Sequence, residues 1–277
     1  DTAGNAGPSA TTANFTIDTT SPTVSSFTMS DTDLKSGDTS TVTLVFSESV
    51  AAFASDDDVA VVNGALASMT SSDNITWTGT YTPTADVEDA TNVLTLATSY
   101  TDTAGNAGPS ATTANFTIDT TAPTVSSFTM SDTDLKSGDT STVTIVFSEV
   151  VVGFASDDDV TAPNGVLTSM TSSNNITWTG VYTPTANVED ATNVLTLATS
   201  YTDTAGNAGP SATTANFTID TTAPTVSSFT MSDTALQSGD TSTVTIVFSE
   251  AVAGFASVSD VTVVNGALTT MTSSDNI

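Results

Sequence analysis

The sequence has no cysteine and no histidine, and its only basic residues are Lys35 and Lys136. The missing cysteines exclude disulfides, and the missing histidines exclude the usual Ser–His and Cys–His nucleophilic pairs. A Ser–Lys pair is the remaining ordinary option. The chain consists of repeats, however, and in the last one (223–277) Gln237 occupies the position of these lysines. The acidic residues lie in turn-like segments with no evident pocket, which disfavours a glycosidase pair of carboxylates. We therefore expect the chain not to be an enzyme.

Positive charge is almost absent, since 31 acidic residues stand against two basic ones and give a formal net charge of −29. Phosphate binding requires Lys and Arg, so nucleic acid is not an expected partner. No stretch approaches the roughly 20 apolar residues of a membrane span, so we expect no membrane insertion in this segment. The excess of carboxylates instead favours hard cations such as Ca²⁺, which prefer oxygen ligands.

A repeat of 101 residues organises the chain. The segment DTAGNAGPSATTANFTIDTT begins at Asp1, at Asp102 and at Asp203. A period near 100 is too long for a solenoid and suits an autonomous sandwich domain. We divide the chain into the C-terminal end of one copy (1–20), two complete copies (21–121 and 122–222) and the N-terminal part of a further copy (223–277). Because both ends cut through a copy, we expect the parent protein to continue on both sides.

Alternation of apolar residues with threonine predicts the strands of each copy. The clearest runs in the first complete copy are 24–29, 41–46, 75–82, 94–96 and 116–118. Trp77 and its counterpart Trp178 alternate with threonines, which predicts that both face the core. With weaker runs included we expect about seven strands and no helix. This pattern predicts an all-β fold of tandem immunoglobulin-like β-sandwiches.

Two local signals make the strand prediction more specific. Asn63-Gly64 separates VAVV from ALASM and predicts a two-residue β-hairpin, in which both turn residues have positive φ. In the next copy Pro163 replaces Val62. Proline lacks the backbone donor of a strand ladder, so we expect this strand to lie at a sheet edge.

Acidic residues from four segments converge on one end of the predicted sandwich, because alternate loops of an antiparallel fold gather at the same pole. Close carboxylates repel by roughly 3 kcal/mol per pair at an effective dielectric near 20, so three or four together call for a cation. Of the run 56–58 only the last Asp persists in all copies, which favours Asp58. The predicted metal ligands are Asp18, Glu48, Asp58, Asp102 and Asn106, then Asp119, Glu149, Asp159, Asp203 and Asn207, and finally Asp220, Glu250 and Asp260.

The alternative is that these Asp and Asn residues only form turns and caps, through side-chain hydrogen bonds to the backbone. The opposite pole is also acidic, over residues 30–38 and 86–89. We interpret its first segment as a solvated turn, since its Gly does not match a calcium loop. In a tandem array this pole faces the next linker, so Glu88 or Asp89 can contribute to a junction site near Asp119.

Several motifs together resemble a known family. The segments SGDTSTVTIVFSE, ITWTGTYTPTA, YTDTAGNAG and IDTTAPTV resemble the tandem bacterial immunoglobulin-like repeats of giant surface adhesins of the RTX and biofilm types. The resemblance covers the whole chain. It implies a β-sandwich, calcium at or near the domain junctions and an extracellular, cell-surface location. By the same resemblance the ligands fall on Glu48, Asp58, Asp102 and the linker residue Asp18, with Asn106 a weaker assignment.

These features lead to one functional hypothesis and one alternative. The first is a calcium-stabilised extender, or stalk, that projects an adhesive domain away from a bacterial cell and whose partners are neighbouring repeats of the same chain. The alternative is a self-assembling structural protein of a surface layer, sheath or extracellular filament, with lateral or end-to-end self-association.

Overall fold

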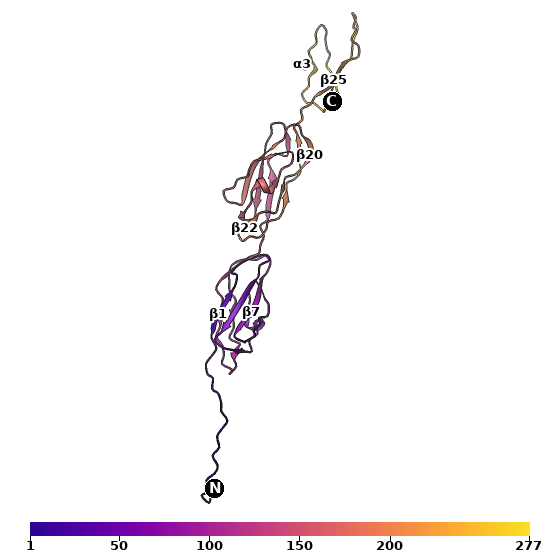
Figure 1. Cartoon of the computed structure of the whole chain (residues 1–277). Helices are drawn as coiled ribbons and strands as arrows, with labels where there is room; N and C mark the ends of the chain where they lie inside the picture. The colour runs from indigo at the N-terminus through magenta and orange to yellow at the C-terminus, as the bar shows by residue number, and fades with distance from the viewer.

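The computed structural model describes residues 1–277 and shows an elongated row of modules (Figure 1). Residues 1–20 form no strand and lead into the first module as an extended segment. Phe15 and Ile17, whose counterparts are buried in the complete modules, are 76% and 77% exposed there. None of the helices is long and apolar enough to cross a membrane.

The first module consists of short strands and a single helical turn. Its elements are β1 (Val24–Met29), β2 (Asp33–Lys35), β3 (Ser40–Phe46), β4 (Val50–Ala51), α1 (Ser55–Asp58), β5 (Val59–Ala60), β6 (Gly64–Leu66), β7 (Thr76–Pro83), β8 (Glu88–Asn92), β9 (Thr95–Leu96), β10 (Thr101–Asp102), β11 (Ala111–Thr112) and β12 (Phe116–Asp119).

The second module repeats this order. Its elements are β13 (Val125–Met130), β14 (Asp134–Lys136), β15 (Ser141–Phe147), β16 (Val151–Val152), α2 (Ser156–Asp159), β17 (Val160–Thr161), β18 (Gly165–Leu167), β19 (Thr177–Pro184), β20 (Glu189–Asn193), β21 (Thr196–Leu197), β22 (Thr202–Asp203), β23 (Ala212–Thr213) and β24 (Phe217–Asp220). The third copy contains β25 (Val226–Met231), β26 (Val244–Phe248) and α3 (Ser257–Asp260).

A four-stranded antiparallel sheet in the order β1-β3-β7-β6 forms one layer of the first module. Smaller sheets, β2-β12-β8, β11-β9-β5 and β10-β4, supply the rest. The pairing of β12 with β2 is parallel, and its pairing with β8 is antiparallel. The last strand of a module is therefore held on both sides, which fixes the direction in which the linker leaves.

The inward side chains of all these sheets meet in one core of 15 buried residues per complete module. In the first module, Phe46, Phe53 and Tyr100 pack in tilted and edge-to-face contacts, with ring centroids 4.8 to 6.2 Å apart. Trp77 is partly buried at the margin of this core, with its ring 4.8 Å from that of Phe53. The predicted inward orientation of the tryptophans agrees with this packing. The all-β, immunoglobulin-like fold predicted from the repeat is confirmed.

The division into strands differs from the prediction of seven. Each complete module has 12 short strands and one helical turn, and residues with positive φ lie in several of the connections between the strands. The two-residue hairpin at Asn63-Gly64 was a wrong prediction. Strand β5 pairs with β9 while β6 pairs with β7, and only Asn63 has a positive φ, at 49°.

Close packing explains the glycine at this position. A Cβ on Gly64 would lie 2.4 Å from Cζ of Tyr81, so a side chain cannot be accommodated without movement. The edge prediction made from Pro163 holds for β17, which is an edge strand, although Pro163 itself lies in the connection after it.

Candidate metal centre at the module junction

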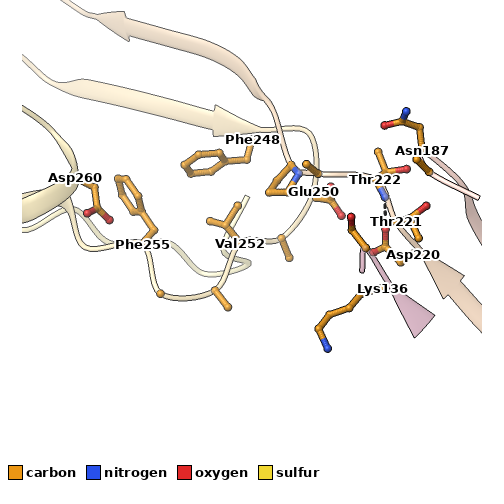
Figure 2. Close-up of a pocket in the computed structure, with 17 residues that line it drawn as sticks. Lys136, Asn187, Asp220, Thr221, Thr222, Phe248, Glu250, Val252, Phe255 and Asp260 are labelled. Atoms are coloured by element: carbon orange, nitrogen blue, oxygen red, sulfur yellow. Dashed lines mark hydrogen bonds between the residues drawn. The ribbon is translucent and has the colours of Figure 1, made fainter. Parts of the chain in front are cut away.

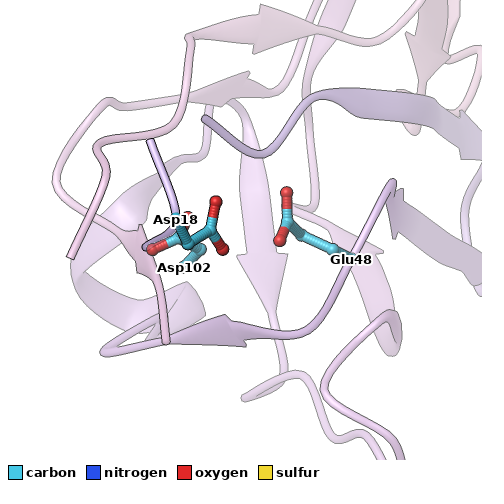
Figure 3. A group of neighbouring side chains, drawn as sticks. All are labelled: Asp18, Glu48 and Asp102. Atoms are coloured by element: carbon cyan, nitrogen blue, oxygen red, sulfur yellow. The ribbon is translucent and has the colours of Figure 1, made fainter. Parts of the chain in front are cut away.

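Three carboxylates meet at the N-terminal end of each complete module. Asp18, Glu48 and Asp102 each offer an oxygen, and these oxygens all lie within 4.8 Å of one another (Figure 3). The same arrangement recurs between the first and second modules, with Asp119, Glu149 and Asp203. We call this second group the junction cluster.

Each carboxylate of the junction cluster comes from a different segment. Asp119 is the last residue of β12, which belongs to the first module, and Glu149 lies in the connection between β15 and β16. Asp203 ends β22, which pairs antiparallel with β16, so that Asp203 lies opposite Val151. The cluster therefore joins the end of one module to two loops of the next.

A tight loop fixes the carboxylate that ends β10. The Asp102 Oδ1 atom accepts hydrogen bonds from the backbone N–H of Ala104 (2.8 Å) and of Asn106 (2.9 Å). The Asn106 Nδ2 atom donates to Asp102 Oδ2 at 2.8 Å. The Asn106 side chain is the main cause that lowers the pKa of Asp102. In the second module the Asp203 Oδ1 atom accepts from the backbone N–H of Gly206 (2.7 Å) and of Asn207 (2.8 Å), and Asn207 Nδ2 donates to Asp203 Oδ2 at 2.7 Å.

The asparagines hold the linker in place rather than offering oxygen to the cluster. Asn106 Nδ2 donates to the carbonyl oxygens of Asp18 and Thr20, each at 3.2 Å. At the junction, Asn207 Nδ2 donates to the carbonyl oxygen of Asp119 at 2.9 Å. Because the amide nitrogen faces the carboxylates, these contacts give both asparagines a positioning role, and their role as ligands stays a prediction.

Asp58 and Asp159 lie outside both carboxylate groups, so their role as metal ligands stays a prediction. Asp58 is only 4% exposed and ends the helical turn α1. Its Oδ2 atom accepts from the backbone N–H of Ala54 at 2.8 Å, and its Oδ1 atom accepts from the Ser99 hydroxyl. Asp159 repeats both contacts. The hydrogen bonds of Asp58 and Asp159 match the alternative interpretation, in which these residues form turns through side-chain contacts.

Unbalanced negative charge marks the junction cluster. Burial, followed by the charges of Asp203 and Glu88, raises the pKa of Asp119. Burial is also the main cause that raises the pKa of Glu149, with the charges of Asp203, Asp119 and Glu88 adding to it. Glu88 lies opposite Asp119 in the register of β8 and β12. Of the two residues expected to contribute to this junction, Glu88 is therefore the one near the cluster, while Asp89 accepts a hydrogen bond from Asn63.

At the second junction the corresponding carboxylates do not form such a group. Asp220, Glu250 and Asp260 line an open cavity of about 690 Å³ between the second module and the third copy (Figure 2). The segment that supplies Asp203 in the second module has no counterpart before Ile277.

The donor chemistry of the junction cluster fits a hard divalent cation. All three side chains offer carboxylate oxygens, linker carbonyls lie beside them, and no nitrogen or sulfur ligand is present. Calcium accepts six to eight oxygen ligands in flexible geometry, which suits donors drawn from separate loops.

A comparison with protein families identifies the family of these modules. The model of the bacterial Ig-like domain matches residues 18–118, 119–219 and 220–277, so each match starts three residues before the copies counted from Ser21. The comparison with curated proteins finds no match.

Several solved structures are similar to the chain in fold. The Escherichia coli adhesin FdeC is 14% identical, with 83% of this chain and 76% of that chain covered and a TM-score of 0.32. InvD of Yersinia pseudotuberculosis is 18% identical, with 79% and 64% covered and a TM-score of 0.28. Murine CEACAM1b is 14% identical, with 73% and 100% covered and a TM-score of 0.25. The three successive family matches span nearly the whole chain, which therefore belongs to the bacterial Ig-like domain family.

Proposed function

We propose that this chain is a calcium-stabilised stalk region of a bacterial cell-surface adhesin, which holds an adhesive domain away from the cell. The observation that carries the proposal is the recurrence of a three-carboxylate group at the start of each complete module, always combining a linker residue with two loops. The elongated row of modules in Figure 1 supports a role that depends on length. The role is structural and extracellular, and no catalytic step is assigned to it.

In this proposal, Asp119, Glu149 and Asp203 hold the cation between the modules. When bound, calcium supplies positive charge that offsets the repulsion among these carboxylates. Asp119 belongs to the end of the first module and the other two to the second, so shared binding limits bending at the linker. Asn207 keeps the carboxylate of Asp203 oriented toward the cluster through its Nδ2 hydrogen bond of 2.7 Å.

Calcium titration of the whole chain tests this role. We expect calcium to raise the melting temperature and to lengthen the particle measured by small-angle X-ray scattering, both relative to chelator. Asp203→Asn should abolish binding at the junction cluster. Asp158→Asn removes the same charge from an exposed position with no side-chain hydrogen bond and should leave binding intact. Equal stability and length in calcium and chelator would overturn the calcium mechanism.

One observation favours the alternative of lateral self-assembly. Across the outward face of the four-stranded sheet, Thr28 is paired with Thr43, Thr43 with Thr78 and Thr78 with Thr70. The second module repeats this row with Thr129, Thr144, Thr179 and Thr171. An uncharged row on a chain of net charge −29 offers a side on which two copies meet with little repulsion.

Electron microscopy separates the two roles. Isolated rods at all protein concentrations favour the stalk, whereas bundles with a regular lateral spacing favour assembly. Thr78→Asp and Thr179→Asp introduce charge into the rows and should disperse any bundles that form through this face.

A further inference from the structure

A direct contact joins the first module to the second beside the junction cluster. The backbone N–H of Ser36, in the turn after β2, donates to Asn207 Oδ1 at 2.8 Å. The side chain of Lys35 lies against Gly206, where an added Cβ would be 3.0 Å from the lysine Nζ. Two neighbouring residues of one module therefore contact two neighbouring residues of the next.

This contact completes the hydrogen bonding of Asn207. Its Nδ2 atom donates to Asp203 Oδ2 and to the carbonyl oxygen of Asp119, and its Oδ1 atom accepts from Ser36. Asn207 is accordingly 3% exposed. Asn106 occupies the same place in the first module, where no folded module precedes it, and it is only partly buried, with no donor to its Oδ1. The preceding module accounts for this difference.

The two lysines provide a second, independent comparison. Lys35 is partly buried against the next module, whereas Lys136, at the junction where the corresponding loop is missing, is exposed. Lys136 instead forms an ion pair with Asp139 at 3.2 Å, and Lys35 forms no ion pair. Both turns have the same backbone closure, since Asp38 N–H donates to Lys35 O and Asp139 N–H to Lys136 O, each at 3.1 Å. The lysine side chain thus differs between junctions while the turn does not.

We propose that the turn 35–38 is a docking surface for the loop 203–207 of the following module and that their contact fixes the angle between modules without a cation. The partner that fits is a module with the loop sequence Asp-Thr-Ala-Gly-Asn. The glycine of that loop has a φ of 97° and lies against the Lys35 side chain, and the asparagine carboxamide accepts from the turn while donating to its own loop and linker. This inference goes beyond the calcium-dependent stalk, because the contact requires no metal.

A proline substitution isolates the contact. Gly37 has a φ of 87°, which with the closure of Lys35 O by Asp38 N–H defines a type II turn with Ser36 at the position that favours proline. Ser36→Pro therefore removes the donor to Asn207 and retains the turn. Ser137→Pro is the matched control, because Gly138 has a φ of 90° and the Ser137 N–H has no hydrogen-bond partner.

The inter-module distance provides the measurement. Because the chain has no cysteine, Thr78→Cys and Thr179→Cys place one spin label on each complete module of the full chain. In excess chelator we expect a narrow distance distribution for the parent and for Ser137→Pro, and a broader one for Ser36→Pro. Equal widths for the parent and Ser36→Pro would overturn the proposal.

A calcium arm separates this inference from the stalk mechanism. If the parent distribution is broad in chelator and narrows only with calcium, the direct contact does not fix the angle and the calcium mechanism stands. If the parent distribution is narrow in chelator and does not change with calcium, while the distribution of Ser36→Pro is wider, the direct contact stands and the calcium mechanism fails.

Discussion

The Asp73 carboxylate in the first module occupies the place of the Asn174 carboxamide in the second. Asp73 Oδ1 accepts from the backbone N–H groups of Ile75 and Thr76, both at 2.9 Å. Asn174 Oδ1 accepts from the counterparts of those two groups, at 3.0 and 2.9 Å. The turn is the same in both modules, and only the first one carries a group that titrates.

This difference predicts that the turn in the first module is sensitive to acid. Hydrogen bonds from the backbone of Thr76 and then of Ile75 lower the pKa of Asp73 below its ordinary value of 3.8. The stabilising effect of the ionised group is present above pH 3.8 and is lost as pH falls through the lowered pKa in the folded state. Asn174→Asp should therefore give the second module the same acid sensitivity, and Asp73→Asn should remove it from the first.

Tryptophan fluorescence can follow each module separately, because the chain has only two tryptophans. Trp178→Phe leaves Trp77 to report on the first module, and Trp77→Phe leaves Trp178 to report on the second. Denaturant midpoints between about pH 2.5 and 7 give the comparison. If the first module keeps its acid response in Asp73→Asn and the second module gains none in Asn174→Asp, the response does not come from this turn.

The contact between Gly64 and Tyr81 predicts a strong local effect. An alanine Cβ would lie 2.4 Å from the tyrosine ring and 2.6 Å from the carbonyl oxygen of Thr82. Gly64→Ala should therefore destabilise the first module by about 1–3 kcal/mol, the usual cost of overpacking, measured by denaturant unfolding followed at Trp77. Gly266→Ala in the third copy is the matched control, since the nearest atom there is Val263 Cγ1 at 3.6 Å. Equal stability of the two variants would contradict the packing argument.

The repeat and the alternation of apolar residues with threonine predicted the fold class and the main strands. These signals are reliable because a buried face must recur at every second residue of a strand. The meeting of Asp18, Glu48 and Asp102 was also accessible, since loop order alone brings those segments to one pole. The hairpin at Asn63-Gly64 was not, because the glycine is required by the Tyr81 ring, a contact between residues distant in sequence.

The role of Asp58 could not be read from the sequence for a similar reason. Its persistence in every copy fits both a ligand and a buried turn residue, and only the position of Ser99 distinguishes them. Lys35 and Ser36 were missed because their contact is made with the next module. The one available signal was that the first two copies place their only lysine at this turn.

Substitution of Asp159 distinguishes a stabilising carboxylate from a ligand. Its oxygens accept from the backbone N–H of Ala155 (2.7 Å) and from the Ser200 hydroxyl. Asp159→Ala should lower the stability of the second module by about 1.5–3 kcal/mol, as expected for hydrogen bonds to a charged group. Isothermal titration calorimetry below the melting transition should give unchanged calcium affinity at the junction cluster, in contrast to Asp203→Asn. A loss of affinity equal to that of Asp203→Asn would return Asp159 to the ligand set.

We predict that the hydroxyl of the linker residue Thr120 anchors the start of the linker to the first module. Its buried hydroxyl donates to the carbonyl oxygen of Thr84 at 2.8 Å and accepts from the N–H of Val87 at 2.9 Å. Thr120→Val keeps the shape but leaves both backbone groups without their partner, at a cost of about 1–3 kcal/mol. We expect a lower denaturant midpoint at Trp77 and a broader distance distribution between the two labelled modules. Thr20→Val is the control, because Thr20 is exposed ahead of the first module. If the two variants behave alike, the hydroxyl does not anchor the linker, and the direction of the second module is set by the Ser36 contact and the junction cluster alone.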